Sequence, residues 1–276
     1  MAALPPSATT GQRIWYWVLW LITGLLLAFL VLPVLVIVPL SFSSGSFLSY
    51  PLPGFSMRWY EELWVDEVWR RSLVNSLIVA AFTVTLATSL GTLAALGLWR
   101  AKLPGRAAIM ALLISPMIVP LVIVAAGAYF FFAPLGLTGS LTGLVIAHTA
   151  LASPFVVITV SATLQGFDAN LVRAASSLGA NAATAFRRVT LPIIAPGVIS
   201  GALFAFVTSW DEVVVAIFLT GPAERTLPRQ MFDGIRENIS PTIAAAATLL
   251  VALSILLMVT MELLRRRGAR LRGVEA

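Results

Sequence analysis

Two consecutive acids, Asp211 and Glu212, lie inside a long apolar stretch of this sequence, directly after Trp210. A carboxylate in such a stretch is costly to bury, and by default it marks a functional position. A carboxylate beside an aromatic face would also suit a cationic amine. Because neighbouring residues on a helix point about 100° apart, only one of the two acids needs to face a polar path. The alternative role is structural: an ion pair with an Arg of a neighbouring subunit, or a cap on backbone groups.

His148 is the only histidine, and the chain has no cysteine. Disulfides, Cys-ligated metals and cysteine nucleophiles are therefore excluded, and one histidine cannot form a His-rich metal site. The sequence contains neither H-E-x-x-H nor G-x-x-x-x-G-K-[ST], the motifs of zinc hydrolases and of nucleotide-phosphate binding. We therefore predict no catalytic residue and no metal ligand. A hydrogen-bonded core histidine is favoured over a proton relay, since a relay needs a second titrating group nearby.

The elements that must position these residues are membrane spans. The chain is 59% hydrophobic and 11% charged, with a mean hydropathy of +0.95, too apolar for an ordinary soluble domain. A bilayer takes about 20 apolar residues as helix. Six stretches reach that length and predict an all-α, polytopic membrane protein with spans at 14–40, 73–99, 107–133, 139–165, 197–221 and 243–264. The first run is too long for a signal peptide, so we interpret it as an uncleaved anchor.

The transmembrane domain is expected to cover 14–264, with tails at 1–13 and 265–276. The net charge of +6 comes from basic residues at the ends of the spans, which indicates topology rather than nucleic-acid binding. The side of the termini holds 12 Lys and Arg residues and the other side 6. By the positive-inside rule both termini are cytoplasmic. The outer segment 41–72 is rich in Trp and predicts a short interfacial helix, with contact to an external partner as the alternative.

The cytoplasmic segment 166–196, between the fourth and fifth spans, has the pattern of a docking element. Four residues recur at i, i+3, i+4 and i+7 and so share one helix face: Leu171, Ala174, Ala175 and Leu178. Gly179 can end this helix in the left-handed conformation. A second short helix follows, and we expect Leu191-Pro192 to stop it.

This segment resembles the EAA loop of ABC importer permeases, whose pattern is E-A-A-x3-G-x9-I-x-L-P. The spacing is kept throughout by the run Arg173-Ala174-Ala175-Ser176-Ser177-Leu178-Gly179 and by Val189-Thr190-Leu191-Pro192. Arg173 stands where the family usually has Glu, which reverses a charge, and Val189 stands where it has Ile. Other stretches are similar to permeases of the spermidine/putrescine type: Asn75-Ser76-Leu77, Ser209 to Val215, Gly221-Pro222 and Leu227-Pro228.

The resemblance implies a non-catalytic permease subunit of an ATP-driven importer in the bacterial inner membrane. It would pair with a second, similar permease, with two ATPase subunits that bind ATP and Mg, and with a periplasmic binding protein, so no cofactor is expected in this chain. The segment 166–196 would be the coupling loop, whose helix passes ATPase closure to the spans. Its coupling residues would be Arg173, Ala174, Ala175, Ser177, Gly179, Leu191 and Pro192.

Within the resemblance, polyamines are the expected substrate, and Trp210, Asp211 and Glu212 are candidates for lining the pathway. The alternatives are an opine, an amino-acid derivative, a phosphonate or ferric iron. A secondary transporter is a more distant alternative, because it would show an internal repeat, and none is clear between residues 1–138 and 139–276.

Overall fold

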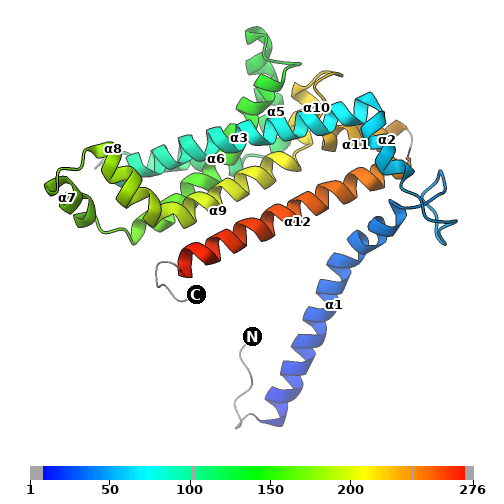
Figure 1. The fold of residues 1–276 in the computed structure, drawn as a ribbon, viewed down its shortest axis with the longest axis horizontal. Coiled ribbons are helices and arrows are strands. Elements are labelled where there is room, and N and C mark those ends of the chain that lie inside the picture. The colour runs from blue at the N-terminus through cyan, green and yellow to red at the C-terminus, as the bar shows by residue number, and fades with distance from the viewer. Residues whose placement is uncertain (1–8, 101–103, 238, 271–276) are drawn as a thin grey trace.

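The computed structural model describes residues 9–100, 104–237 and 239–270, and the regular elements in these ranges are helices (Figure 1). The predicted all-α class is therefore confirmed. The predicted tails 1–13 and 265–276 lie partly outside the described residues. In the described part of the chain, five helical segments are long and apolar enough to cross a membrane. Three of them are α1 (Thr10–Leu40), α3 (Glu67–Arg100) and α6 (Leu141–Gln165). The fourth runs over Ala182–Trp210 and ends in α9 (Leu191–Trp210), and the fifth is Pro241–Leu263 of α12 (Pro241–Arg270).

The third predicted span, 107–133, is two helices instead of one. Helix α4 (Arg106–Ile118) and helix α5 (Leu121–Phe132) meet at 104°, and a 3-10 turn (Ala133–Leu135) follows α5. The bend lies at Val119 and Pro120, where Val119 is extended with ψ 134°. Proline disfavours helical backbone in the residue before it, which explains the break. The chain thus has six spans only if this bent pair is counted as one.

The fifth predicted span, 197–221, also differs from expectation. Helix α9 begins at Leu191 directly after a π-helix (Phe186–Thr190), and the helical path from Ala182 to Trp210 is continuous, so Leu191-Pro192 does not stop a helix as expected. Pro192 lacks the N–H that would continue the helical hydrogen-bond ladder, and the chain changes its hydrogen-bond pattern in the π-helix just before it. Helix α9 then ends at Trp210, and a short helix α10 (Val214–Leu219) begins after a break. Asp211 and Glu212 therefore lie in this break and not inside a continuous helix.

The centre of the molecule is a three-helix core of α3, α6 and α9, which make the most extensive contacts with one another. Small residues allow this close packing. A Cβ placed on Gly201 of α9 would lie 2.9 Å from the Cα of Val156 on α6. A Cβ on Gly91 of α3 would lie 2.7 Å from the Cβ of the same valine. Helices meet this closely in membranes where glycine leaves room.

The two ends of the core carry different short helices (Figure 1). Helices α7 (Asn170–Ser177) and α8 (Ala182–Ala185) lie at one end, and helices α2 (Arg58–Val65) and α11 (Leu227–Glu237) lie at the other. The short helix predicted in the segment 41–72 is α2. Its Trp59 is buried and packs in a cluster with Leu227 and Ile243, so this tryptophan joins two elements instead of lying free at a membrane surface.

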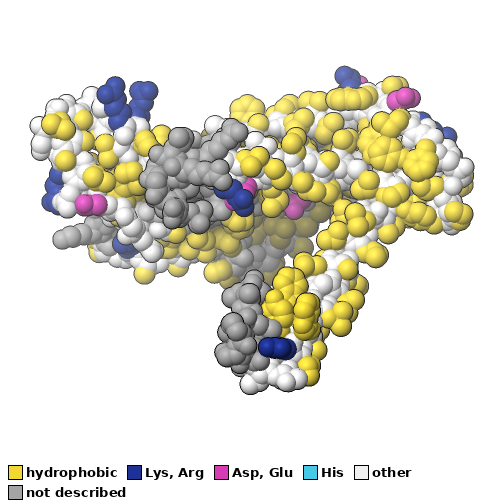
Figure 2. All heavy atoms as spheres, turned by 60° about the horizontal axis from the view of Figure 1, so that its bottom comes forward, with side chains coloured by type: hydrophobic (Ala, Val, Ile, Leu, Met, Phe, Trp, Pro, Cys, Tyr) yellow, Lys and Arg dark blue, Asp and Glu magenta, His cyan; other side chains and the backbone are white. Residues whose placement is uncertain are grey.

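Helix α1 stands apart from the core. None of its residues is buried, and it contacts α12. Figure 1 shows it leaving the rest of the molecule at an angle, and Figure 2 shows hydrophobic side chains along it and over most of the visible face. Such a surface is stable in lipid, whose hydrocarbon core is as apolar as the side chains.

Candidate functional site

The break between α9 and α10 is fixed by the side chain of Glu212. Oε1 of Glu212 accepts a hydrogen bond from the backbone N–H of Val215 at 2.6 Å, and Oε2 accepts one from Ala216 at 3.0 Å. These N–H groups belong to the first turn of α10 and have no carbonyl partner in that helix. Glu212 thus caps α10 while only 6% exposed.

His148 reaches the same carboxylate from α6. Its Nε2 lies 3.1 Å from Oε2 of Glu212, and its Nδ1 lies 2.9 Å from the hydroxyl oxygen of Ser209 on α9. An ionised carboxylate can only accept, so with Glu212 ionised the donor in this bond is Nε2 of His148. The prediction of a hydrogen-bonded core histidine is confirmed, since His148 is 1% exposed. Glu212 is a second titratable group within hydrogen-bond distance of this histidine.

Sequence reasoning missed the pairing of His148 with Glu212, although a signal was present. The two residues lie at similar distances, counted in residues, from the loop 166–196 that joins their helices. Since the two helices run in opposite directions from that loop, both side chains come to a similar depth.

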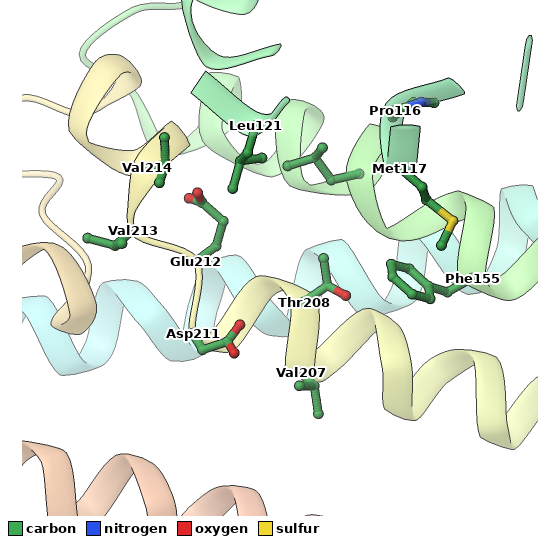
Figure 3. A pocket seen from close by; sticks show the side chains of 11 residues that line it. Pro116, Met117, Leu121, Phe155, Val207, Thr208, Asp211, Glu212, Val213 and Val214 are labelled. Atoms are coloured by element: carbon green, nitrogen blue, oxygen red, sulfur yellow. The ribbon is translucent and has the colours of Figure 1, made fainter. Parts of the chain in front are cut away.

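Asp211 has a different environment. It is exposed, and it lines a hollow of about 430 Å³ between α9, α10, α6 and the bent pair α4 and α5. Figure 3 shows the two carboxylates pointing in different directions. The remaining walls of the hollow are mainly apolar and comprise Pro116, Met117, Leu121, Leu151, Phe155, Val207, Thr208, Val213 and Val214. The exposed acid in this hollow is Asp211, whereas Glu212 is already engaged.

The structure does not bring Trp210 together with Asp211. Trp210 is 2% exposed, stacks on Phe206 with ring centroids 5.5 Å apart, and donates its indole N–H to the carbonyl of Leu250 on α12 at 3.3 Å. Its side chain thus faces α12, as the angle of about 100° between neighbouring helical residues allows. The aromatic residue in the hollow is instead Phe155, which stacks on Phe204 at 5.7 Å.

The loop 166–196 contains the predicted helix, bend and second helix. Helix α7 is followed by Gly179 with φ +86° and then by α8. A five-residue π-helix, Phe186–Thr190, joins α8 to α9, so the chain continues into the membrane without a stop. Arg173 is exposed, and its guanidinium donates to the side-chain oxygen of Asn170.

The loop packs on the rest of the protein through residues outside the set of four that share the apolar face. Phe167 is buried against Trp99 with ring centroids 5.3 Å apart, and Val172 packs in the same cluster. The predicted apolar face points outward, with Leu178 89% exposed and Leu171 44% exposed. The space beside it is a hollow of about 370 Å³ between α7 and the segment that follows.

The other predicted loop residues are arranged around this surface. Ala174 and Ser177 are exposed on α7, and Ala175 is half-buried. Leu191 and Pro192 follow the π-helix at the start of α9 and are not among the residues that line the hollow beside α7.

Comparison with known proteins gives a family and a fold. Residues 87–270 match the family described as binding-protein-dependent transport system inner membrane component. The spermidine/putrescine transport system permease protein PotC of Haemophilus influenzae is 33% identical over 198 residues, which cover 72% of this chain and 77% of that protein. The putrescine transport system permease protein PotI of Escherichia coli K12 is 35% identical, with coverage of 64% and 65%.

Solved structures agree on the fold. A chain of a bacterial ABC transporter that imports the acidic polysaccharide alginate superposes with a TM-score of 0.71 and 17% identity, covering 95% of this chain and 99% of that one. A chain of the MetNI methionine ABC transporter, in an inward-facing conformation, gives a TM-score of 0.57 at 20% identity, with coverage of 76% and 97%.

Proposed function

The chain belongs to the family of binding-protein-dependent transport system inner membrane components, and from that membership we propose that it forms one half of the membrane pathway of an ATP-driven importer. The observation that carries this proposal is the family match itself. It runs from within α3 to the end of α12, and so it includes α6, α9, the C-terminal part of α3, the break at Asp211 and the coupling loop. Six spans, with the bent pair α4 and α5 as the third, and cytoplasmic termini complete the proposal.

The partners would be a second permease, two ATPase subunits and a periplasmic binding protein. The outward-facing Leu178 and the hollow beside Gly179 support contact with an ATPase, because an apolar side chain that is 89% exposed at a helix end fits a protein interface better than water. ATP and Mg would be bound by the ATPase. Its closure would move α7 and α8, and the continuous helical path from α8 into α9 would carry that motion to the core.

The proposed substrates are polyamines. The PotC and PotI relatives carry spermidine and putrescine in their names. The exposed Asp211 supports the same class, since a carboxylate in a largely apolar hollow favours a cation over an anion or a neutral solute. Apolar walls would contact the methylene segments between the amines.

Two experiments test the proposal. Cells lacking this gene should lose uptake of labelled spermidine or putrescine, and the restored gene should return it. The tagged chain, purified in mild detergent, should bring with it an ATPase and a second permease. Unchanged polyamine uptake in the deletion strain would remove the substrate assignment, and failure to co-purify with any ATPase would remove the assembly.

A further inference from the structure

We infer that His148 is a positioning residue: it holds the Glu212 carboxylate on the start of α10 and so fixes the break at which Asp211 faces the hollow. The inference rests on the proposed function for its meaning in transport. The geometry behind it comes from three separate elements, namely α6, the end of α9 and the start of α10.

Both carboxylate oxygens of Glu212 have hydrogen-bond partners. Each carboxylate oxygen accepts from the backbone of α10, and Oε2 accepts in addition from Nε2 of His148. The side chains of His148 and Glu212 are 0% and 4% exposed, so water does not replace a lost donor without a change in packing. Charge-assisted bonds of this kind are among the stronger ones in proteins, and losing one partner leaves the other buried and unsatisfied.

The hydrogen bond between His148 and Glu212 joins two different parts of the fold. It lies on α6, which is part of the core, whereas Glu212 lies in the short connection between α9 and α10. The contact therefore ties the connection between α9 and α10 to the core of the molecule. An imidazole can donate this bond without carrying charge, unlike Lys or Arg, and so need not place a cation beside a hollow proposed to receive one.

A matched pair of substitutions tests the inference in the assembled transporter. In His148→Gln the side-chain amide can reach the place of Nε2 and still donate to Glu212. In His148→Asn the shorter amide corresponds to Nδ1 and reaches only toward Ser209. Both substitutions remove the imidazole ring, and they differ in whether the remaining amide can donate to Glu212. We expect His148→Gln to keep spermidine-stimulated ATP hydrolysis within about threefold of the original chain, and His148→Asn to lower it by about tenfold or more, the size of one lost charge-assisted bond.

A distance measurement reads the geometry independently of transport. Since the chain has no cysteine, spin labels can be attached to introduced cysteines at Phe82 on α3 and Phe218 on α10, both partly exposed. We expect one narrow distance distribution for the original chain and His148→Gln, and a broader or shifted one for His148→Asn. Assembly of His148→Gln with failure of His148→Asn to assemble would also support the inference.

Equal behaviour of the two variants would overturn the inference. If both match the original chain, the contact with Glu212 is not needed. If both are impaired alike, or neither assembles, the ring or its bond to Ser209 matters instead. A complex of the original chain that moves no polyamine would count against the proposed function, while the distance distributions would still decide the role of His148.

Discussion

Asp211 and Glu212 are neighbours with the same charge and different surroundings. Glu212 is buried and accepts three hydrogen bonds, whereas Asp211 is exposed in a hollow. This division assigns the structural role considered for the pair to Glu212 and leaves Asp211 free to meet a substrate. The sequence could show that the two side chains point apart, but not which of them has a partner, because His148 lies 64 residues from Glu212.

Asp211→Asn should impair transport without impairing assembly. The change keeps the shape of the side chain and removes the negative charge that we propose attracts a cationic amine. We expect the rate of polyamine uptake at low substrate concentration to fall by about tenfold, the scale of one charged hydrogen bond, while the binding protein retains its affinity.

The matched control for Asp211 is Glu67→Gln, which neutralises an acid at an exposed surface pair with Arg71. Exposed pairs contribute little, so uptake should stay near the original rate. Equal uptake by the Asp211 and Glu67 variants would take Asp211 out of the pathway.

The helices themselves were predictable at the scale of elements, because runs of apolar residues long enough for a bilayer recur along the chain. The positions at which these helices are interrupted were harder to predict. The bend at Pro120 follows from local chemistry that the sequence does contain. The break at Asp211 depends on Glu212 capping α10, and the start of α9 at Leu191 depends on a π-helix, so neither is visible in apolar periodicity.

The outward face of α7 leads to a prediction about the ATPase. Leu178→Ser should weaken co-purification with the ATPase by about tenfold, since burying one leucine side chain in an interface contributes roughly 1.5–3 kcal/mol. The fold should not change, because this side chain is 89% exposed. A binding assay between the ATPase and the permease pair in detergent measures the effect.

Val65→Ser provides the control for Leu178, since Val65 is 84% exposed on α2 at the other end of the molecule. Its substitution should leave ATPase binding as it was. If the original chain, Leu178→Ser and Val65→Ser all bind the ATPase equally, the ATPase contact lies elsewhere.

The core makes a separate prediction at Gly201. An added methyl would come within 2.9 Å of the Val156 Cα and 2.7 Å of the Thr159 hydroxyl, and a backbone atom cannot move aside cheaply. Gly201→Ala should therefore destabilise the protein by about 1–3 kcal/mol, the usual range for overpacking. Thermal unfolding in detergent should show a lower midpoint, whereas Gly127→Ala, with nothing within 4 Å of the added atom, should not. Identical midpoints would mean that α6 and α9 are not packed this closely.

The whole molecule has two distinct ends, and we propose its orientation in the membrane from the distribution of basic residues. The end with α7 and α8 is proposed to face the cytoplasm, and the end with α2 and α11 the periplasm. The sequence could predict this polarity from charge alone. It could not predict that α1 would contact α12 while burying none of its own residues, because side-chain composition does not specify which helix covers which.

Single cysteines test the orientation directly, since the chain has none of its own. A cysteine at Val65 should react with a membrane-impermeant maleimide added to intact cells with a permeable outer membrane. A cysteine at Ala169, exposed in the loop 166–196, should react only after the inner membrane is opened. Labelling of Ala169 from outside would reverse the proposed topology.

The central claim is that this chain forms half of a polyamine pathway driven by a partner ATPase. Its most direct test is accumulation of labelled spermidine in proteoliposomes that contain this chain, the second permease and the ATPase, with ATP inside and the binding protein outside. We predict accumulation that requires ATP, the binding protein and this chain together. Spermidine accumulation that continues without this chain or without ATP would contradict the account. So would a complex that transports another solute but neither spermidine nor putrescine.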